Sequence, residues 1–197
     1  MENEHYFSRE PKSRIKETLV SYSFLGKKLE FYCVSGVFSS RGIDFATSLL
    51  LHNAQLGNGW KVLDLGCGIG VIGISVKKAY SSCDVVLSDI NNRALKYAEK
   101  NTKLNKVDVD IVSSDLFENL DGKFDTIITN PPHHAGRDVV YKIIEQSFDH
   151  LNDGGCLQLV AKHSKGGKML EKKMNEVFGN CSALVKKSGW RVYCSRR

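Results

Sequence analysis

The chain has 197 residues, 42% of them hydrophobic, a size that suits one globular domain with a full core. No apolar run approaches the roughly 20 residues of a membrane-spanning helix, and the acidic start lacks the features of a signal peptide, so we expect a soluble, cytoplasmic protein. The six cysteines form no C-x-x-C pair, which favours buried free thiols over a zinc site or a disulfide framework.

Positive charge gathers towards the C-terminal end. The formal net charge is +6, and residues 161–197 hold ten Lys or Arg against two acids. Such a segment favours a polyanionic partner, and RNA is the partner that we expect. We expect Lys172 and Lys173 to contribute to RNA binding, although a solvated helix face would explain the same charge.

The pattern of apolar residues predicts an N-terminal β extension over residues 1–36 and an α/β domain over residues 37–197. In the extension, strands at 19–24 and 29–34 flank a glycine-containing turn as a β-hairpin. A loop and a helix at 45–56 follow, and then strands and helices alternate, which indicates a mostly parallel sheet. The expected strands are 61–65, 84–88, 109–113, 124–129, 155–161, 182–187 and 190–195, and the expected helices are 71–80, 92–104, 137–151 and 165–178. Only Ser188 and Gly189 separate the last two strands, so these two must be antiparallel.

A glycine-rich loop follows the first strand of the alternating series. Gly66, Gly68 and Gly70 come behind Asp64, at the position where open α/β sheets bring their backbone against a ligand. A dinucleotide pattern, G-x-G-x-x-G, also begins at Gly68, but it starts two residues late. No basic residue between 64 and 73 is present to meet a pyrophosphate, so this pattern does not decide the cofactor.

Acidic residues follow the next two strands. Asp89, with Ile90 after it, suits the two hydroxyls of a ribose. Asp115, with Leu116 after it, suits the amino group and ring face of an adenine, although Asp115 alone could simply cap the next helical turn. Together with the glycine loop, these residues predict a nucleoside that carries an amino-acid tail.

The stretch Asn130-Pro131-Pro132-His133-His134 directly follows the strand at 124–129. Prolines donate no backbone hydrogen bond and fix their own φ, so two prolines after a strand do not help to build the sheet. We therefore expect this segment to have a functional role. We interpret the Asn130 amide oxygen and the Pro131 carbonyl as acceptors that hold a planar NH₂ group for alkylation. A metal on the two adjacent histidines is disfavoured, because their side chains diverge and no Cys or Asp nearby completes a set. Cytosine-C5 chemistry is set aside, because it needs a nucleophilic cysteine and none occurs near this motif.

With both motifs in view, the chain resembles the S-adenosylmethionine-dependent methyltransferases of the Rossmann-like class I fold. More narrowly, it is similar to the small-domain ribosomal RNA guanine-N2 methyltransferases, over residues 36–39, 44, 64–70, 130–136, 151–155 and 189–192. The resemblance implies a seven-stranded sheet of order 3-2-1-4-5-7-6 with an antiparallel last strand. It also implies S-adenosylmethionine as cofactor and guanine N2 of small-subunit ribosomal RNA as the methylated group, on a flipped or single-stranded base. We expect no metal, for the reason given for the two histidines.

The predicted site combines the motifs with this resemblance. The catalytic residues expected are Asn130, Pro131, Pro132 and His133. The cofactor contacts expected are Phe38, Asp44, Asp64, Gly66, Cys67, Gly68, Gly70, Asp89, Ile90, Asp115, Leu116 and Asn130. Phe38, Arg41 and Asp44 would close over the amino-acid tail, or they are ordinary loop residues.

Position 133 departs from the commoner family pattern. Most amine methyltransferases have an aromatic residue there that stacks on the target base, whereas His133 is a weaker platform. Two alternatives share parts of the pattern. A protein glutamine-N5 methyltransferase has the Asn-Pro-Pro motif, but usually an aromatic next and a helical N-terminal domain. A non-catalytic RNA-binding module would keep the fold and use the basic C-terminal segment.

Overall fold

The structure is a computed structural model that describes residues 16–37, 42–131 and 136–197. The predicted site residues Phe38, Arg41, Pro132, His133 and His134 lie outside the described residues. The elements in chain order are β1 (Glu17–Phe24), β2 (Lys27–Val34), α1 (Phe45–Asn53), β3 (Lys61–Leu65), α2 (Val71–Ala79), β4 (Asp84–Asp89), α3 (Asn92–Asn105), β5 (Asp110–Ser113), β6 (Phe124–Thr129), α4 (Arg137–Asp149), β7 (Leu151–Lys162), the π-helical turn η1 (His163–Gly167), α5 (Lys168–Phe178), β8 (Ser182–Lys187) and β9 (Trp190–Arg196).

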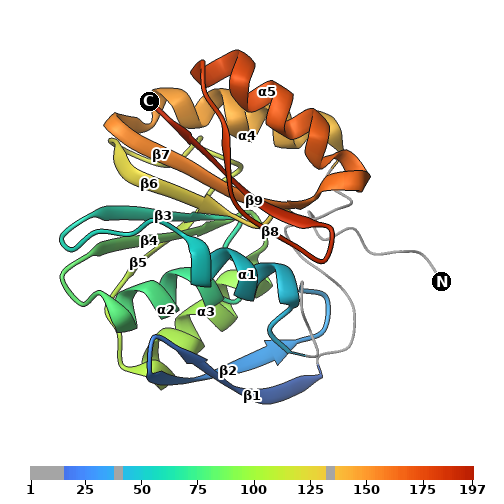
Figure 1. Cartoon of the computed structure of the whole chain (residues 1–197). Helices are drawn as coiled ribbons and strands as arrows, with labels where there is room; N and C mark the ends of the chain where they lie inside the picture. The colour runs from blue at the N-terminus through green and yellow to red at the C-terminus, as the bar shows by residue number, and fades with distance from the viewer. Residues whose placement is uncertain (1–15, 38–41, 132–135) are drawn as a thin grey trace.

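A seven-stranded sheet in the order β5-β4-β3-β6-β7-β9-β8 forms the centre of the molecule (Figure 1). Strand β9 runs antiparallel to both of its neighbours, β7 and β8, and the other pairs are parallel. Numbered without the hairpin, this is the order 3-2-1-4-5-7-6. The class I methyltransferase fold predicted from the sequence is therefore confirmed.

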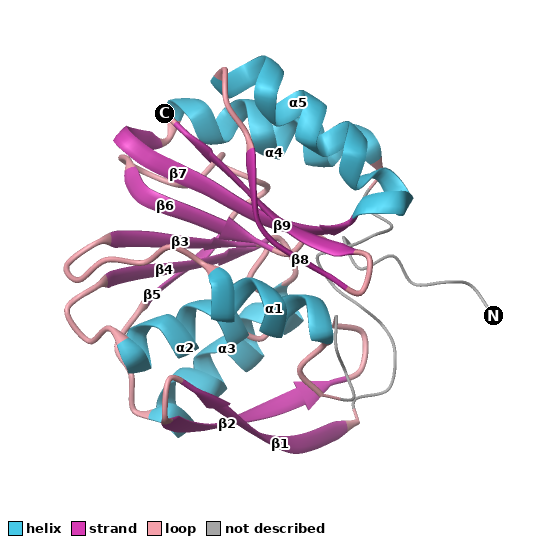
Figure 2. Ribbon diagram, viewed as in Figure 1, coloured by secondary structure: helices cyan, strands magenta, loops and turns pink. Residues whose placement is uncertain are grey.

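Helices cover both faces of the sheet, with α1, α2 and α3 on one side and α4 and α5 on the other (Figure 2). Neighbouring strand residues divide between the two cores. Val62 packs in one apolar cluster with Ile74 of α2, and Leu63 packs in the other with Ile144 of α4. Because both faces are buried, ligands can approach the sheet only at its edges and strand ends.

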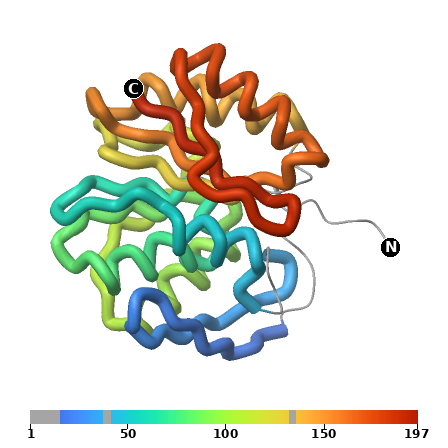
Figure 3. The backbone as a smooth tube through the Cα atoms, viewed as in Figure 1, coloured from blue at the N-terminus to red at the C-terminus, as the bar shows by residue number. Residues whose placement is uncertain are grey.

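The β1–β2 hairpin forms a separate two-stranded sheet outside α2 and α3 (Figures 1 and 3). Leu29 and Phe31 bury its inner face. The outer edge of β2 is paired by side-chain amides of α3: Asn101 bonds Tyr32 N and O at 2.8 and 3.3 Å, and Asn105 bonds Glu30 N and O at 3.0 and 2.8 Å. These amides satisfy backbone groups that an edge strand otherwise leaves unpaired.

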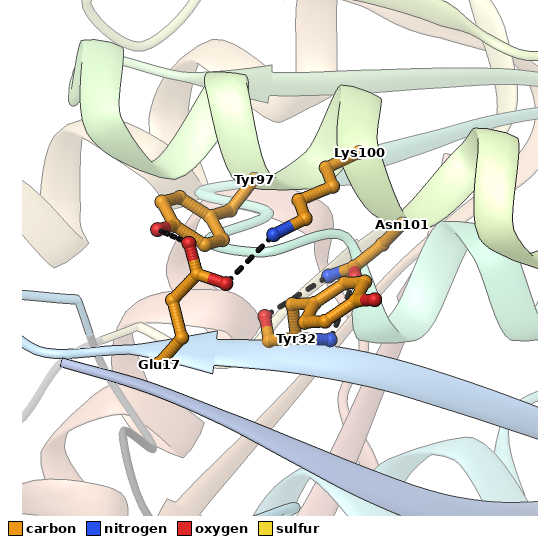
Figure 4. A network of polar contacts seen from close by, with 5 residues as sticks. All are labelled: Glu17, Tyr32, Tyr97, Lys100 and Asn101. Carbon is orange, nitrogen blue, oxygen red and sulfur yellow. Dashed lines mark hydrogen bonds and ion pairs between the residues drawn. The ribbon is translucent and has the colours of Figure 1, made fainter.

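A charged cluster completes this interface (Figure 4). The Glu17 carboxylate accepts from the Tyr97 hydroxyl and from Lys100 Nζ, the latter at 2.7 Å, and Lys100 Nζ lies 3.7 Å from the centre of the Tyr32 ring. Burial, together with the hydrogen bond to Glu17, raises the pKa of Tyr97 to about 12. Asn101 Nδ2 also donates to Ile69 O at 3.0 Å. The hairpin is thus tied to the helix that supports the glycine loop.

Most predicted elements agree with the structure to within one or two residues, a common margin for element ends. The helix predicted at 45–56 ends at Asn53, because Gln55 N and O both bond the Gln158 side chain, at 2.7 and 2.8 Å. The helix predicted from 165 begins at Lys168, because Lys165 and Gly166 have non-helical φ/ψ, with φ of −116° and 96°.

The strand predicted at 155–161 is longer, because β7 already pairs at Leu151 with Phe124 and then resumes at Cys156 after an irregularity. The six cysteines are free thiols, as predicted; five are buried and Cys181 is half-buried. No helix in the described ranges is long and apolar enough to span a bilayer.

Candidate functional site

The carboxyl ends of four adjacent strands bring most of the predicted site residues to one edge of the sheet. Strand β3 leads to residues 66–70, β4 ends at Asp89, β5 leads to Asp115, and β6 leads to Asn130. Parallel strands all point the same way, so these four ends lie side by side although they are far apart in sequence, from Gly66 to Asn130. This is the edge at which open α/β sheets bind ligands.

The glycine loop is held in an open conformation. Gly66 N and Cys67 N donate to Ser88 O at 2.8 and 2.9 Å, and Gly66, Gly68 and Gly70 have φ of 69°, 56° and 83°. A Cβ at Gly66 would meet nothing within 4 Å, so the backbone there has room for a ligand. By contrast, a Cβ at Gly73 would lie 2.1 Å from Leu87, so Gly73 serves the packing of α2 on β4. The dinucleotide-like pattern therefore ends in a packing glycine.

Asp64 is 1% exposed, and only one of its two carboxylate oxygens has a hydrogen-bond partner in the described residues. Its Oδ2 accepts from Gly73 N at 2.9 Å, whereas its Oδ1 has no hydrogen-bond partner among the residues that the structure describes. Burial raises its pKa to about 7, against the Gly73 hydrogen bond, and nearby Asp89 adds to the increase. A buried carboxylate oxygen without a partner is costly, and a cation is the ligand that would relieve it. The ammonium group of an amino-acid tail fits this requirement.

Asp89 lies at the carboxyl edge of the sheet and also stabilises the glycine loop by hydrogen bonding. It is 3% exposed; its Oδ2 accepts from Gly68 N at 2.8 Å and its Oδ1 from Asn91 N at 2.9 Å. The sequence reasoning missed this structural role. A carboxylate can accept several hydrogen bonds at once, and contact of Asp89 with ribose hydroxyls stays a prediction.

Asp115 is exposed and Leu116 is half-buried. In the turn that follows β5, Ser114 Oγ accepts from Asn119 N at 3.0 Å, and Asn119 Nδ2 donates to Ser113 O at 2.8 Å. No side-chain cap by Asp115 occurs within the described part of the chain. Its carboxylate therefore remains available for a ligand group at the same edge. Ile90, half-buried after β4, adds apolar surface there.

The Asn130 side chain is anchored through its nitrogen. Nδ2 donates to Thr47 Oγ1 at 2.9 Å and reaches Asp44 Oδ1 at 3.5 Å, while the Thr47 hydroxyl donates to Asp44 Oδ2 at 2.6 Å. Within the described ranges no group donates to Asn130 Oδ1, so the amide presents an acceptor oxygen. Such an arrangement can orient a substrate N–H.

Asp44 therefore has a role that the sequence reasoning did not anticipate. Its Oδ1 caps α1 by accepting from Ala46 N and Thr47 N at 2.9 and 3.0 Å. The Asp-x-x-Thr spacing at the start of α1 was the available signal for Thr47, since an acidic N-cap brings the third residue back towards it. Contact of Asp44 with a cofactor stays a prediction.

A pocket of about 230 Å³ opens beside Pro131. It lies between the start of α4 and the segment that leads into α5. Its lining includes Pro131, Gly136, Arg137, Ala161, Lys165 and Met169. The pocket reaches Pro131, the residue after Asn130, and its lining has both apolar and basic side chains.

Comparison with known proteins identifies the family of the chain. A family model described as "Methyltransferase small domain" matches residues 28–194. An uncharacterized protein of Bacillus subtilis, YbxB, is 33% identical over 201 residues and is covered to 99%, as is this chain. Ribosomal RNA small subunit methyltransferase C of Haemophilus influenzae (Rd) is 42% identical over 171 residues, which are 85% of this chain and 51% of that protein.

A solved structure is also similar: the T. thermophilus 16S rRNA N2 G1207 methyltransferase RsmC in complex with AdoMet and guanosine. It superimposes with a TM-score of 0.79 at 26% identity, over 95% of this chain and 52% of that one. The chain thus spans about half the length of the methyltransferases C that it matches. The predicted cofactor, S-adenosylmethionine, agrees with the family and with this neighbour. By the family model and by these relatives, the chain belongs to the methyltransferase small-domain family.

Proposed function

We propose that the protein is an S-adenosylmethionine-dependent N-methyltransferase acting on guanine N2 of small-subunit ribosomal RNA. The observation that carries the proposal is the anchoring of Asn130 through its nitrogen, with Thr47 2.9 Å away. That anchoring leaves the amide oxygen as an acceptor beside the glycine loop. The named relatives, a ribosomal RNA small subunit methyltransferase C and a 16S rRNA N2 methyltransferase, supply the substrate class.

The chain's own residues would hold the cofactor along the strand ends. Asp64 Oδ1 accepts from the ammonium group, Asp89 from the ribose hydroxyls, and Asp115 from the adenine amino group. Gly66, Gly68 and Gly70 let the tail lie against the backbone, with Cys67 between them and with Ile90 and Leu116 against the adenine ring. When bound, S-adenosylmethionine supplies an electrophilic methyl group on a sulfonium.

The nitrogen to be methylated is a poor nucleophile in its resting state, because the lone pair of a guanine amine is delocalised into the ring. Hydrogen bonds from its two N–H groups to Asn130 Oδ1 and the Pro131 carbonyl favour a pyramidal nitrogen and aim its lone pair. Bound S-adenosylmethionine would supply its methyl group to this nitrogen, with loss of the sulfonium bond, and one amine proton would leave to solvent. Position and polarisation supply the catalysis, without a covalent enzyme intermediate.

The pocket beside Pro131 is the place where we expect the target base. Its walls combine apolar side chains with Arg137 and Lys165, which suit a flipped base and its phosphate. Pro132 and His133 would contact the base from the next positions of the chain. A ribosomal RNA substrate also implies a cytoplasmic location.

Transfer of a labelled methyl group tests the proposal. The protein is incubated with methyl-labelled S-adenosylmethionine and either naked small-subunit RNA or isolated subunits, and the digested nucleosides are identified by mass spectrometry. We expect N2-methylguanosine. Label on a glutamine side chain of a protein, or on another nucleoside, would contradict the proposed substrate.

The Asn130→Ala variant tests the mechanism in the same assay. Loss of one preorganised polar contact at a reacting centre typically costs about 100-fold to 1,000-fold in rate. We expect a loss of at least that size, while calorimetry gives an unchanged affinity for S-adenosylmethionine. A variant with normal turnover would exclude Asn130 as the amine acceptor.

A further inference from the structure

The basic residues of the C-terminal segment fall into two groups according to their partners. Four of the ten Lys and Arg residues after position 160 form ion pairs: Lys172–Glu176, Lys173–Glu145, Arg191–Glu171 and Arg197–Asp153. Arg196 donates to Gly154 O and to Gln55. The other five have no acidic partner among the residues that the structure describes: Lys162, Lys165, Lys168, Lys186 and Lys187.

These five lysines lie at the same edge of the sheet as Asn130. Lys162 ends β7, which is parallel to β6, and η1 carries Lys165 immediately beyond it. Strand β9 is antiparallel to both β7 and β8, so β8 also ends at this edge, at Lys187 (Figure 2). Lysine charge that is not matched by an acid is therefore concentrated where the substrate must approach.

Three side chains form a row across the strand ends. Trp190 pairs directly with Lys162 on one side and with Lys187 on the other. Directly paired residues point their side chains to the same face, so these three share one face. The next row contains Arg191, which bonds Glu171 of α5, so that row lies on the α5 face. Lys162, Trp190 and Lys187 therefore lie on the α1 face, the side from which Thr47 anchors Asn130. We call these three residues the basic row.

The basic row extends beyond the catalytic position. Leu159 pairs with Thr129, the residue before Asn130, and β7 continues three residues further to Lys162. At about 3.3 Å per residue, the row lies about 10 Å further along the strand direction. The two ammonium groups of the row, on Lys162 and Lys187, offer partners for phosphates.

We propose that the basic row is the docking surface for the RNA backbone that flanks the target nucleotide. This inference rests on the proposed function and adds where the RNA lies. It assigns the electrostatic contact to the β8–β9 turn and the end of β7. Lys172 and Lys173 of α5 form ion pairs with Glu176 and Glu145 and are assigned no contact.

Two double variants with the same change in charge test the assignment. Lys162→Gln/Lys187→Gln removes the two cations of the row, and Lys172→Gln/Lys173→Gln is the matched control on α5. Binding of a fluorescein-labelled fragment of small-subunit ribosomal RNA is measured by anisotropy over a series of KCl concentrations. Thermal melting and the affinity for S-adenosylmethionine, which we expect to be unchanged, establish that both variants are folded.

The row variant should lose about 1.4 units from the slope of log K against log [KCl], at about 0.7 per phosphate contact on a single strand. The same slope predicts about 25-fold weaker binding at 0.1 M salt, while the control stays within about twofold of the wild type. Equal slopes for the two variants would overturn the docking surface. Wild-type protein that binds the RNA with the expected slope but transfers no methyl group to it would contradict the proposed function and leave the docking surface supported.

Discussion

The hairpin–α3 interface and the carboxyl edge of the sheet both contain asparagine and acidic side chains, but they differ in how many polar atoms have protein partners. At the interface, Asn101 and Asn105 use both their nitrogen and their oxygen on the backbone of β2. At the edge, Asp64 Oδ1 and Asn130 Oδ1 have no donor within the described ranges.

This difference separates polar residues that stabilise the fold from polar residues that await a ligand. A buried polar atom without a partner costs about 1–3 kcal/mol. The chain satisfies such atoms completely in the hairpin contact, whereas it retains unsatisfied ones at the strand ends.

The largest effect concerns Asp64 and pH. Its folded pKa of about 7 lies above the ordinary value of 3.8, so the ionised form is disfavoured in the fold. The cofactor-free protein should therefore lose stability as pH rises from about 4 to 7, by up to about 4 kcal/mol, with no further loss above that range. Urea unfolding of wild type and Asp64→Asn across this range measures the effect, which should be absent in the variant.

S-adenosylmethionine provides the matching control, because its ammonium group would pair with the ionised carboxylate. The cofactor should bind more tightly at pH 8 than at pH 5, and Asp64→Asn should lose that dependence. Identical pH curves for the two proteins would remove Asp64 from the ammonium site.

The next effect concerns Asp89. Asp89→Ala removes the acceptor of Gly68 N together with the predicted ribose contact. We expect about 100-fold weaker binding of S-adenosylmethionine, since two hydrogen bonds to a charged group contribute about 3 kcal/mol or more. Asp84→Ala, at the opposite and exposed end of the same strand, is the control for titration calorimetry. Equal affinities for the two variants would contradict the assignment.

Asn101 belongs to the hairpin–α3 interface, where the side-chain amide has protein partners for both its nitrogen and its oxygen. Asn101→Leu leaves the Tyr32 backbone and Ile69 O without partners and should lower the free energy of unfolding by about 2–3 kcal/mol. Asn105→Leu breaks the neighbouring amide pair but not the contact with the glycine loop. Both variants should therefore unfold at lower urea concentration, and only Asn101→Leu should also weaken cofactor binding. If both weaken it equally, the link through Ile69 is unimportant.

Thr47 is expected to give the smallest effect. Thr47→Val removes the acceptor that holds Asn130 Nδ2, so the amide can rotate. We expect kcat to fall about 10-fold, about 1.4 kcal/mol, with the KM for S-adenosylmethionine unchanged. Thr47→Ser keeps the hydroxyl and should restore kcat, which a purely structural role of the methyl group would not predict.

Much of the fold follows from local sequence. The alternation of strands and helices from residue 60 predicts the parallel sheet, and the two-residue turn at Ser188 predicts the antiparallel end. Where the predicted elements differ from the structure, contacts between residues far apart in sequence determine where the element ends. Gln158 draws residues 54–56 out of helix α1 from 103 positions away, which no local pattern signals.

The candidate site also contains some residues that local sequence identifies and some contacts that only the tertiary structure shows. The glycines and strand-end acids could be identified in sequence, because motif spacing and strand position locate them. The Thr47–Asn130 contact spans 83 positions, and the separation of ion-paired from unmatched lysines depends on where α4, α5 and β9 meet. Charge counting along the chain could not have made that separation, since Lys173 finds Glu145 on another helix.

The reversed strand β9 has a practical consequence for experiments. It carries residue 197 back to the start of β7, where Arg197 N donates to Gly155 O at 3.0 Å and Gly154 N donates to Arg197 O at 3.1 Å. That is the end of the sheet opposite Asn130. An affinity tag or a surface linker attached after Arg197 would therefore hold the protein with its glycine loop and basic row turned towards the solution.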